Sequence, residues 1–259
     1  MNRVNTLPSD PPWLIGSISA TSSVIINGSS ITTFFAQSGR YPTFTFAGFI
    51  NSVDTRIIQI VIAGLSHRTF YASSFAEWTE IVSTYSTHVH RGKLEIMDGF
   101  GFQLVSTNRI INSNINTIST WPIGNFITKD ITQDFPTGLA RLRNQILAFG
   151  QETVEIFHNA GLSPAPLARL PYLTARIGLQ SGGIGSATEY YALVGGRLFF
   201  NSNFNGAYSY DGARFEKIST PAVDKIFNQQ SVLSVDRISF HQQEAVSFRL
   251  TAISASTQR

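Results

Sequence analysis

The chain has 259 residues, of which 42% are hydrophobic, and this is enough for one large core or two small ones and argues against disorder. Its formal net charge is only +3 and no run of five or more basic residues occurs, so charge alone is weak evidence for nucleic-acid binding. The lack of cysteine excludes disulfide bonds and thiolate metal sites.

Charged residues make up 14% of the chain, against about a quarter in a typical globular protein. Residues typical of turns and strands are plentiful, with 20 glycines and 20 phenylalanines. We therefore expect an all-β protein with an unusually uncharged surface. A surface of this kind suits burial against neighbouring subunits.

The first 53 residues are expected to form an extended arm and short strands that dock on neighbours. Prolines near the start exclude helix there, and they are Pro8, Pro11 and Pro12. Short strands are expected at Ser23–Ile26, which ends at the turn Asn27-Gly28, and at Thr43–Phe46. The first residues lack a signal-peptide core and no run of eighteen apolar residues follows, so we expect synthesis without export and no membrane insertion.

Residues 54–259 are expected to form a propeller-like β domain, because pairs of β-rich runs recur along them with a glycine or polar turn inside each pair. The expected hairpins are Ile57–Ala63 with Thr69–Ala72, Leu94–Met97 with Phe102–Val105, Ile146–Phe149 with Val154–Phe157, Leu198–Asn201 with Ala207–Tyr210, and Ile238–His241 with Ala245–Leu250. Aligned on one strand, Leu94, Ile146 and Leu198 recur every 52 residues. Strand repeats of about 50 residues are typical of β-propeller blades.

At most one or two short helices are expected within this array of antiparallel hairpin blades. A further hairpin turns at Asp211-Gly212, and a helix follows it that Ser219 or Thr220 can cap and that has Pro221 in its first turn. Its apolar residues fall on one face, and they are Val223, Ile226 and Phe227. For Ser74–Trp78, a capping box favours helix and the blade pattern favours a strand, so both remain open.

No pattern typical of catalysis, cofactor binding or metal binding stands out, so we expect a protein that is not an enzyme and has no cofactor. His88 and His90 have a spacing that would place them on one face of a strand, but no third ligand follows at metal-binding spacing. The glycine-rich segment Gly182–Ser186 lacks the lysine that grips a nucleotide phosphate. Glu152 and Glu155 are predicted to point to opposite faces of a strand.

Five arginines near predicted strand ends and turns are the candidates for contacts with DNA phosphates in a channel or with acidic groups of a neighbouring subunit. They are Arg141, Arg143, Arg169, Arg176 and Arg197. The alternative for each is a solvated charge in a turn.

From Gly138 to Asn228 the chain resembles the tail accessory proteins of short-tailed phages, which are also called packaged-DNA stabilisation or nozzle proteins. The likeness is carried by Leu142–Gly161, Pro166–Arg169, the loop ending in Arg176-Ile177-Gly178, Leu198–Phe200 and Phe215–Ala222. The resemblance implies a structural virion protein in the tail or head-to-tail connector. It would form a ring, expected to be hexameric, beneath the portal and adaptor rings, extend the DNA channel, and help to retain packaged double-stranded DNA until ejection.

A carbohydrate-binding or carbohydrate-cleaving propeller is the alternative. Trp78, Trp121 and tyrosines would stack on sugars if their rings were exposed. Packing of these tryptophans in a core or an interface is the competing interpretation.

Overall fold

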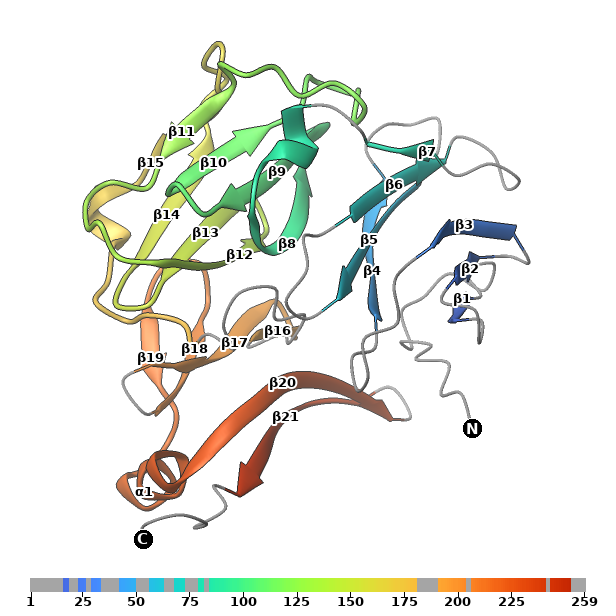
Figure 1. Cartoon of the computed structure of the whole chain (residues 1–259). Helices are drawn as coiled ribbons and strands as arrows, with labels where there is room; N and C mark the ends of the chain where they lie inside the picture. The colour runs from blue at the N-terminus through green and yellow to red at the C-terminus, as the bar shows by residue number, and fades with distance from the viewer. Residues whose placement is uncertain are drawn as a thin grey trace, which may run out of the picture.

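In a computed structural model of the chain, the described residues form six antiparallel sheets that follow one another in chain order around the molecule (Figure 1). The structure describes residues 16–18, 23–26, 29–33, 42–49, 56–62, 68–72, 79–81, 84–180, 191–203, 206–240 and 243–252. Four of the sheets have four strands each, and we call each of these a blade. The predicted all-β, propeller-like class is confirmed.

Within each blade, every strand pairs with the strand before it. The first blade contains β4 (Pro42–Phe49), β5 (Arg56–Ile62), β6 (Arg68–Ala72) and β7 (Thr79–Glu80). The second contains β8 (His90–Met97), β9 (Phe100–Val105), β10 (Arg109–Asn112) and β11 (Phe126–Thr128). The third contains β12 (Pro136–Leu142), β13 (Gln145–Gly150), β14 (Val154–Asn159) and β15 (Leu167–Arg169). The fourth contains β16 (Tyr191–Val194), β17 (Arg197–Ser202), β18 (Gly206–Tyr210) and β19 (Phe215–Lys217).

Smaller sheets flank the four blades along the chain. A three-stranded sheet of β1 (Gly16–Ile18), β2 (Ser23–Ile26) and β3 (Ser29–Thr33) precedes them. A long hairpin of β20 (Gln230–Phe240) and β21 (Gln243–Ala252) follows them. Strand β4 pairs with β5 across residues 53 and 54, so a blade spans the expected domain boundary, while the docking role of residues 1–53 stays a prediction.

Helical structure in the described residues is short. The α-helix α1 (Pro221–Gln229) begins at the proline, as predicted, and the 3-10 helices η1 (Thr84–Thr87) and η2 (Pro171–Leu173) have one turn each. Phe227 of α1 is buried against Ala192 and Ala207, whereas Val223 and Ile226 are exposed. The segment Ser74–Trp78 lies outside the described residues.

The predicted hairpins are confirmed where the structure describes them. Each of the five predicted pairs is an antiparallel neighbour pair in the sheets, and of their residues Ala63 and His241 lie outside the described residues. At the β8–β9 turn, Asp98 and Gly99 have φ values of 52° and 79°, which is the pair of positive angles that a two-residue hairpin turn needs. The predicted hairpin at Asp211-Gly212 is present as the β18–β19 turn, where Gly212 has a φ of 102° and Asp211 does not have a positive φ.

The 52-residue spacing holds for only one of the two predicted steps. Ile146 and Leu198 are equivalent, because each is the second residue of the second strand of its blade. Leu94 instead lies in β8, the first strand of its blade, so its predicted equivalence was wrong. The second strand of that blade, β9, begins 45 residues before β13.

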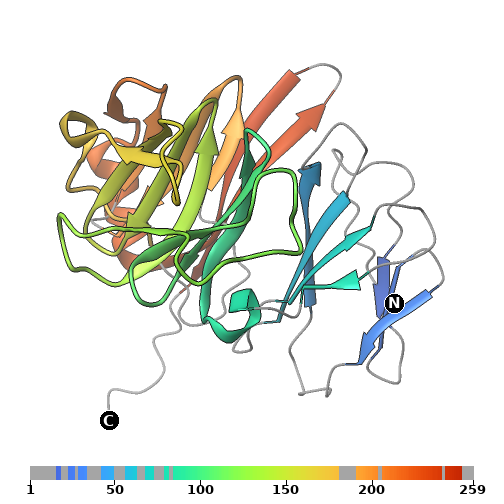
Figure 2. The same ribbon diagram turned by 90° about the horizontal axis from the view of Figure 1, so that it is seen from above.

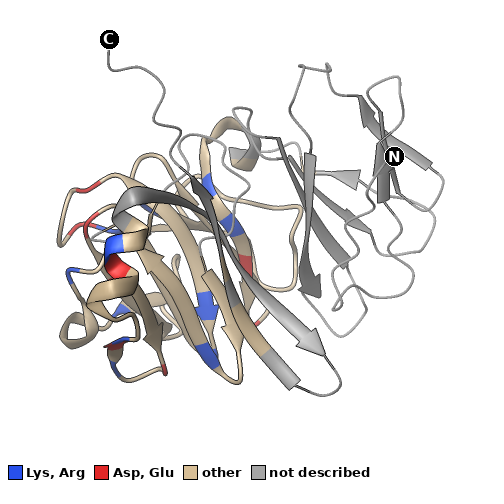
Figure 3. Cartoon of the chain, turned by 90° about the horizontal axis from the view of Figure 1, so that it is seen from below, with Lys and Arg blue, Asp and Glu red and all other residues tan. Residues whose placement is uncertain are grey.

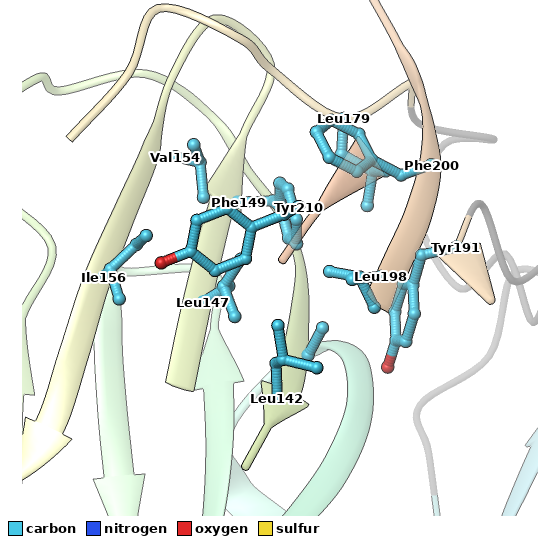
Figure 4. Close-up of a cluster of buried hydrophobic side chains, with 11 residues drawn as sticks. Leu142, Leu147, Phe149, Val154, Ile156, Leu179, Tyr191, Leu198, Phe200 and Tyr210 are labelled. Carbon is cyan, nitrogen blue, oxygen red and sulfur yellow. The ribbon is translucent and has the colours of Figure 1, made fainter. Parts of the chain in front are cut away.

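Apolar layers between successive blades form the core, so both faces of the central strands are buried. One layer lies between the third and fourth blades and includes Leu147, Phe149, Leu198 and Phe200 (Figure 4). Another joins the second blade to the third through Phe102 and Ile146, among others. Figure 2 shows these blades side by side. Burial on both faces explains why β13 reads as a continuous apolar run without alternation.

The first strands of neighbouring blades approach each other closely on the inner side. A Cβ placed on Gly92 of β8 would lie 2.7 Å from Cα of Gly138 in β12, so β8 has no room for a side chain at this position. The hydroxyl of Tyr191 in β16 lies 2.8 Å from the carbonyl oxygen of Leu139 and 2.8 Å from Oε1 of Glu95 in β8. The first strands of three blades are thereby tied together.

Candidate functional site

Three of the five predicted arginines lie together at one end of the third and fourth blades, and we call this the arginine end. Arg141 is near the end of β12, Arg143 is in the β12–β13 turn, and Arg197 begins β17. All three are exposed. The β18–β19 turn brings a fourth exposed arginine, Arg214, which sequence reasoning did not single out. Charged residues of the described sheets and of α1 are coloured in Figure 3.

Arg143 lies where turns from two blades meet. A Cβ on Gly212 would lie 3.4 Å from NH1 of Arg143, and a Cβ on Gly196 would lie 3.9 Å from its NH2. The guanidinium of Arg141 donates to the carbonyl oxygen of Ile96 in the second blade and, from Nε, to the carbonyl oxygen of Arg143 at 2.8 Å. Arg141 therefore also has a structural role, whereas the guanidinium of Arg143 lies at the surface.

Acidic residues partly offset the charge of the arginine end. Arg197 lies 3.8 Å from Glu216, and Arg214 lies 3.9 Å from Asp211, and all four side chains keep substantial exposure. Backbone N–H donors of Arg214 and Ala213 lower the pKa of Asp211, so this carboxylate is charged at neutral pH. Exposed ion pairs of this kind are weak and are easily exchanged for other partners.

The other two predicted arginines lie apart from the arginine end. Arg169 is on the fourth strand of the third blade, in the same row as Arg141 on the first strand, and Arg176 lies near the β13–β14 turn at the opposite end. Arg169 closes β15, where its Nε lies 2.8 Å from Oε2 of Glu155 and its NH2 contacts Asp130. Arg176 follows the bridge between Ala175 and Val154 at the start of β14, and its side chain is exposed. The structure therefore separates the five candidates into two groups.

A buried charge network joins the second blade to the third. Nζ of Lys129 forms an ion pair with Asp134, donates to Oγ1 of Thr153 at 3.1 Å, and lies 3.9 Å from Oε1 of Glu155. The Oδ2 atom of Asp134 accepts from the backbone N–H groups of Glu152 and Thr153, at 2.8 and 2.9 Å. Because each carboxylate has a cation and further donors, the network is structural. Sequence reasoning did not single out Lys129 or Asp134.

The two neighbouring histidines do not form a metal site. His88 precedes β8, while His90 begins it and is buried against the Tyr85 ring, with ring centroids 4.1 Å apart. Nε2–H of His90 donates to the carbonyl oxygen of Tyr85 at 2.8 Å. Within the described residues, no group of three His, Asp or Glu side chains is placed to hold a metal ion. Gly182–Ser186 lies outside the described residues.

We predict that acidification destabilises the chain through His90. Burial lowers the pKa of His90 from 6.5 to about 4, against the opposing effect of its bond to Tyr85. Because the unfolded state binds the proton more readily, the stabilisation is complete above pH 6.5 and is lost as the pH falls from 6.5 to 4. Urea unfolding from pH 7 to pH 4 measures it. His90→Phe should flatten this dependence, and the same substitution at the half-buried His158 should leave it in place.

The candidate sugar platform is absent at Trp121. This side chain is buried, its Nε1–H donates to the carbonyl oxygen of Ile118 at 2.6 Å, and its ring lies 4.5 Å from that of Tyr85. Trp78 lies outside the described residues. Stacking on a sugar needs an exposed ring, so Trp121 does not support the carbohydrate alternative.

Comparison with known proteins places the chain in a family. A family model described as Bacteriophage P22 Gp10, beta-propeller, matches residues 94–252, which is more than half of the chain. The chain belongs to this phage stabilisation family. The P22 Gp10 family match starts in β8 and ends with β21, so it spans the second, third and fourth blades and the long hairpin. The family match contains the whole segment from Gly138 to Asn228, over which the sequence resembles the tail accessory proteins. A search of curated proteins gave no match.

Of the solved structures that are similar to this chain, the first of the following supports the fold. BBS1N in complex with ARL6DN is 12% identical, with 91% of this chain and 71% of that chain covered and a TM-score of 0.50. The computationally designed Ika8 protein is 12% identical, with 96% and 71% covered and a TM-score of 0.48. BamB from Moraxella catarrhalis is 13% identical, with 83% and 66% covered and a TM-score of 0.42. At such identities the likeness concerns the fold alone. No helix in the described part of the chain has the length and apolar character needed to span a membrane.

Proposed function

We propose that the chain is a non-enzymatic structural protein of the phage tail or head-to-tail connector. In this proposal it forms an oligomeric ring, expected to be a hexamer, that extends the DNA channel and helps to retain packaged DNA until ejection. The observation that carries the proposal is the match of the P22 Gp10 family model to residues 94–252. The flanking partners would be the portal or adaptor ring and other tail proteins.

The arginine end gives this proposal a physical mechanism. Arg143, Arg197 and Arg214 are exposed and belong to rigid turns of two blades that share a buried core. Arginine binds phosphate with two parallel hydrogen bonds, so such turns can slow DNA movement without reading sequence. Their weak pairing with Asp211 and Glu216 leaves the guanidinium groups available for exchange.

The ring itself is tested by the mass of the purified protein and by its appearance in electron micrographs. We expect rings in micrographs and particles that lose their DNA when the gene is deleted from the phage. A protein that stays monomeric at high concentration and does not bind portal or adaptor rings would contradict the proposal.

The role of the arginines has a separate prediction. The double variant Arg143→Gln and Arg197→Gln should weaken binding to a labelled DNA duplex equally for different sequences. Each lost phosphate contact lowers the salt slope of binding by about 0.9, so the slope should fall by roughly 2. Fluorescence anisotropy at several salt concentrations measures this. Arg176→Gln is the control, because Arg176 is an exposed arginine toward the opposite end of the blades. Equal slopes for the double variant and the wild type would remove these two arginines from the DNA contact.

A further inference from the structure

Among the described residues, Arg91 is a buried arginine without a counter-charge. It is the second residue of β8 and its side chain is only 6% exposed. The guanidinium carbon lies 4.4 Å above the centre of the Phe135 ring, so an aromatic ring covers one face of the guanidinium. In the part of the chain that the structure describes, Nε and NH1 of Arg91 are buried without a hydrogen-bond partner.

Two buried acidic groups of the neighbouring blade are already engaged. Asp134 precedes Phe135 directly, but its oxygens are taken by Lys129, Thr153 and the backbone of Glu152. Glu155 is paired with Arg169. An arginine stays protonated in proteins. Burial lowers the pKa of Arg91, because removal from water disfavours the charged form. A buried cation without a carboxylate is unfavourable for the isolated chain.

Three exposed apolar side chains lie at the same end of the second and third blades as this buried cation. Val89 is 45% exposed, Phe135 is 40% exposed and Ile131 is 48% exposed. Backbone hydrogen bonds bring their segments to the same end of the second and third blades, because Ser106 donates to Val89, Lys129 donates to Asn108, and Gln151 donates to Phe135. We call Val89, Arg91, Ile131 and Phe135 the Arg91 patch. It lies at the end away from Arg143.

The composition of the Arg91 patch favours a protein partner over DNA. Arginines and aromatic rings at the centre of an apolar, water-excluding rim are typical of the residues that carry binding energy in protein interfaces. Contacts to DNA phosphates instead come from solvated basic groups within a polar surface. The Arg91 patch has one cation among three apolar side chains, so an acidic side chain on an apolar surface is its complement.

We propose that the Arg91 patch docks another virion protein, whose Asp or Glu carboxylate pairs with Arg91 while its apolar side chains cover Val89, Ile131 and Phe135. The docking surface goes beyond the proposed function. It rests on that function in one respect, which is that the partner is a virion protein. The complex would then supply the counter-charge that the described part of this chain lacks.

The first test is the stability of the purified chain. Arg91→Met removes an unpaired buried cation and keeps an apolar stem, so the urea midpoint should be unchanged or higher. Arg169→Met is the matched control, and its midpoint should fall because it leaves Glu155 without its guanidinium. A fall for Arg91→Met as large as that for Arg169→Met would overturn the proposal, since Arg91 would then be a structural residue of the fold.

The second test uses the phage that encodes the chain. Arg91→Glu places a carboxylate against the partner's carboxylate, so the yield of infectious particles should drop at least tenfold. Suppressor mutants should change an Asp or Glu of another virion protein to Lys or Arg. Normal yield, or suppressors confined to this chain, would overturn the proposal. So would weaker DNA binding of Arg91→Met in the anisotropy assay, because the ligand would then be DNA.

The two proposals fail in different ways. If deletion of the whole gene leaves particles and their DNA unaffected, the proposed virion function fails. If the deletion abolishes particles while Arg91→Glu does not change their yield, only the docking surface fails.

Discussion

Replacing Lys129 with methionine is expected to lower the free energy of unfolding by about 3–5 kcal/mol, the range for removing one partner of a buried ion pair. Nζ of Lys129 is enclosed by Asp134, Thr153 and Glu155 at the junction of two blades. Methionine would fill much of the space but would leave buried carboxylate oxygens without the cation. Urea unfolding at pH 7 measures the change.

The control is the same substitution at an exposed lysine. Lys217 donates to Oδ2 of Asp224 at 2.6 Å, but its side chain is 42% exposed, so water replaces the lost contact. Lys217→Met should leave the urea midpoint almost unchanged. Similar midpoints for the two variants would show that the Lys129 network does not hold the blades together.

Replacing Gly178 with alanine is expected to destabilise the chain by about 3 kcal/mol, at the upper end of the usual range for overpacking. A Cβ on Gly178 would overlap the carbonyl oxygen of Gln151 in the β13–β14 turn, and a backbone atom cannot rotate away. The carbonyl oxygen of Gly178 also accepts from the backbone N–H of Asn203, which fixes its position.

Gly124→Ala is the matched control for this prediction. A Cβ on Gly124 would meet no atom within 4 Å, and the stability should change by less than about 0.5 kcal/mol. Thermal unfolding of both variants compares them directly. A Gly178→Ala variant as stable as Gly124→Ala would mean that the linker before β16 shifts freely against the third blade.

The hairpins could be predicted because their turns carry local information. Asp98-Gly99 and Gly150 mark reversals whatever the tertiary structure is. The position of a strand within its blade carries no such mark. Leu94 and Ile146 each lie on a strand that ends at a glycine-containing turn and pairs with the next strand, so the local sequence does not distinguish a first strand from a second one. The register of the 52-residue repeat was therefore right for Leu198 and wrong for Leu94.

The arginines show the same limit at the level of the site. The sequence shows that these arginines lie near strand ends. Successive turns of an antiparallel sheet lie at opposite ends of the sheet, so the sequence does not show which arginines share an end. Only the topology reveals that Arg143 lies beside the turn that precedes Arg197, while Arg169 is paired with Glu155 on the fourth strand of its blade. Lys129 and Arg91 had no local signal, because a lysine or arginine near the end of a strand is normally solvated. The family match remains the strongest guide to function, and the resemblance had already included Gly178.

The bridge made by Tyr191 has a consequence for how the blades unfold. In a repeat array, each module usually contacts only its nearest neighbours, so melting can proceed module by module from either end. The Tyr191 hydroxyl reaches Leu139 in the adjacent blade and also Glu95 in the blade beyond it. Fraying of the fourth blade therefore removes contacts from two others at once. Hydrogen exchange should report β8, β12 and β16 as one cooperative unit, with a common opening free energy.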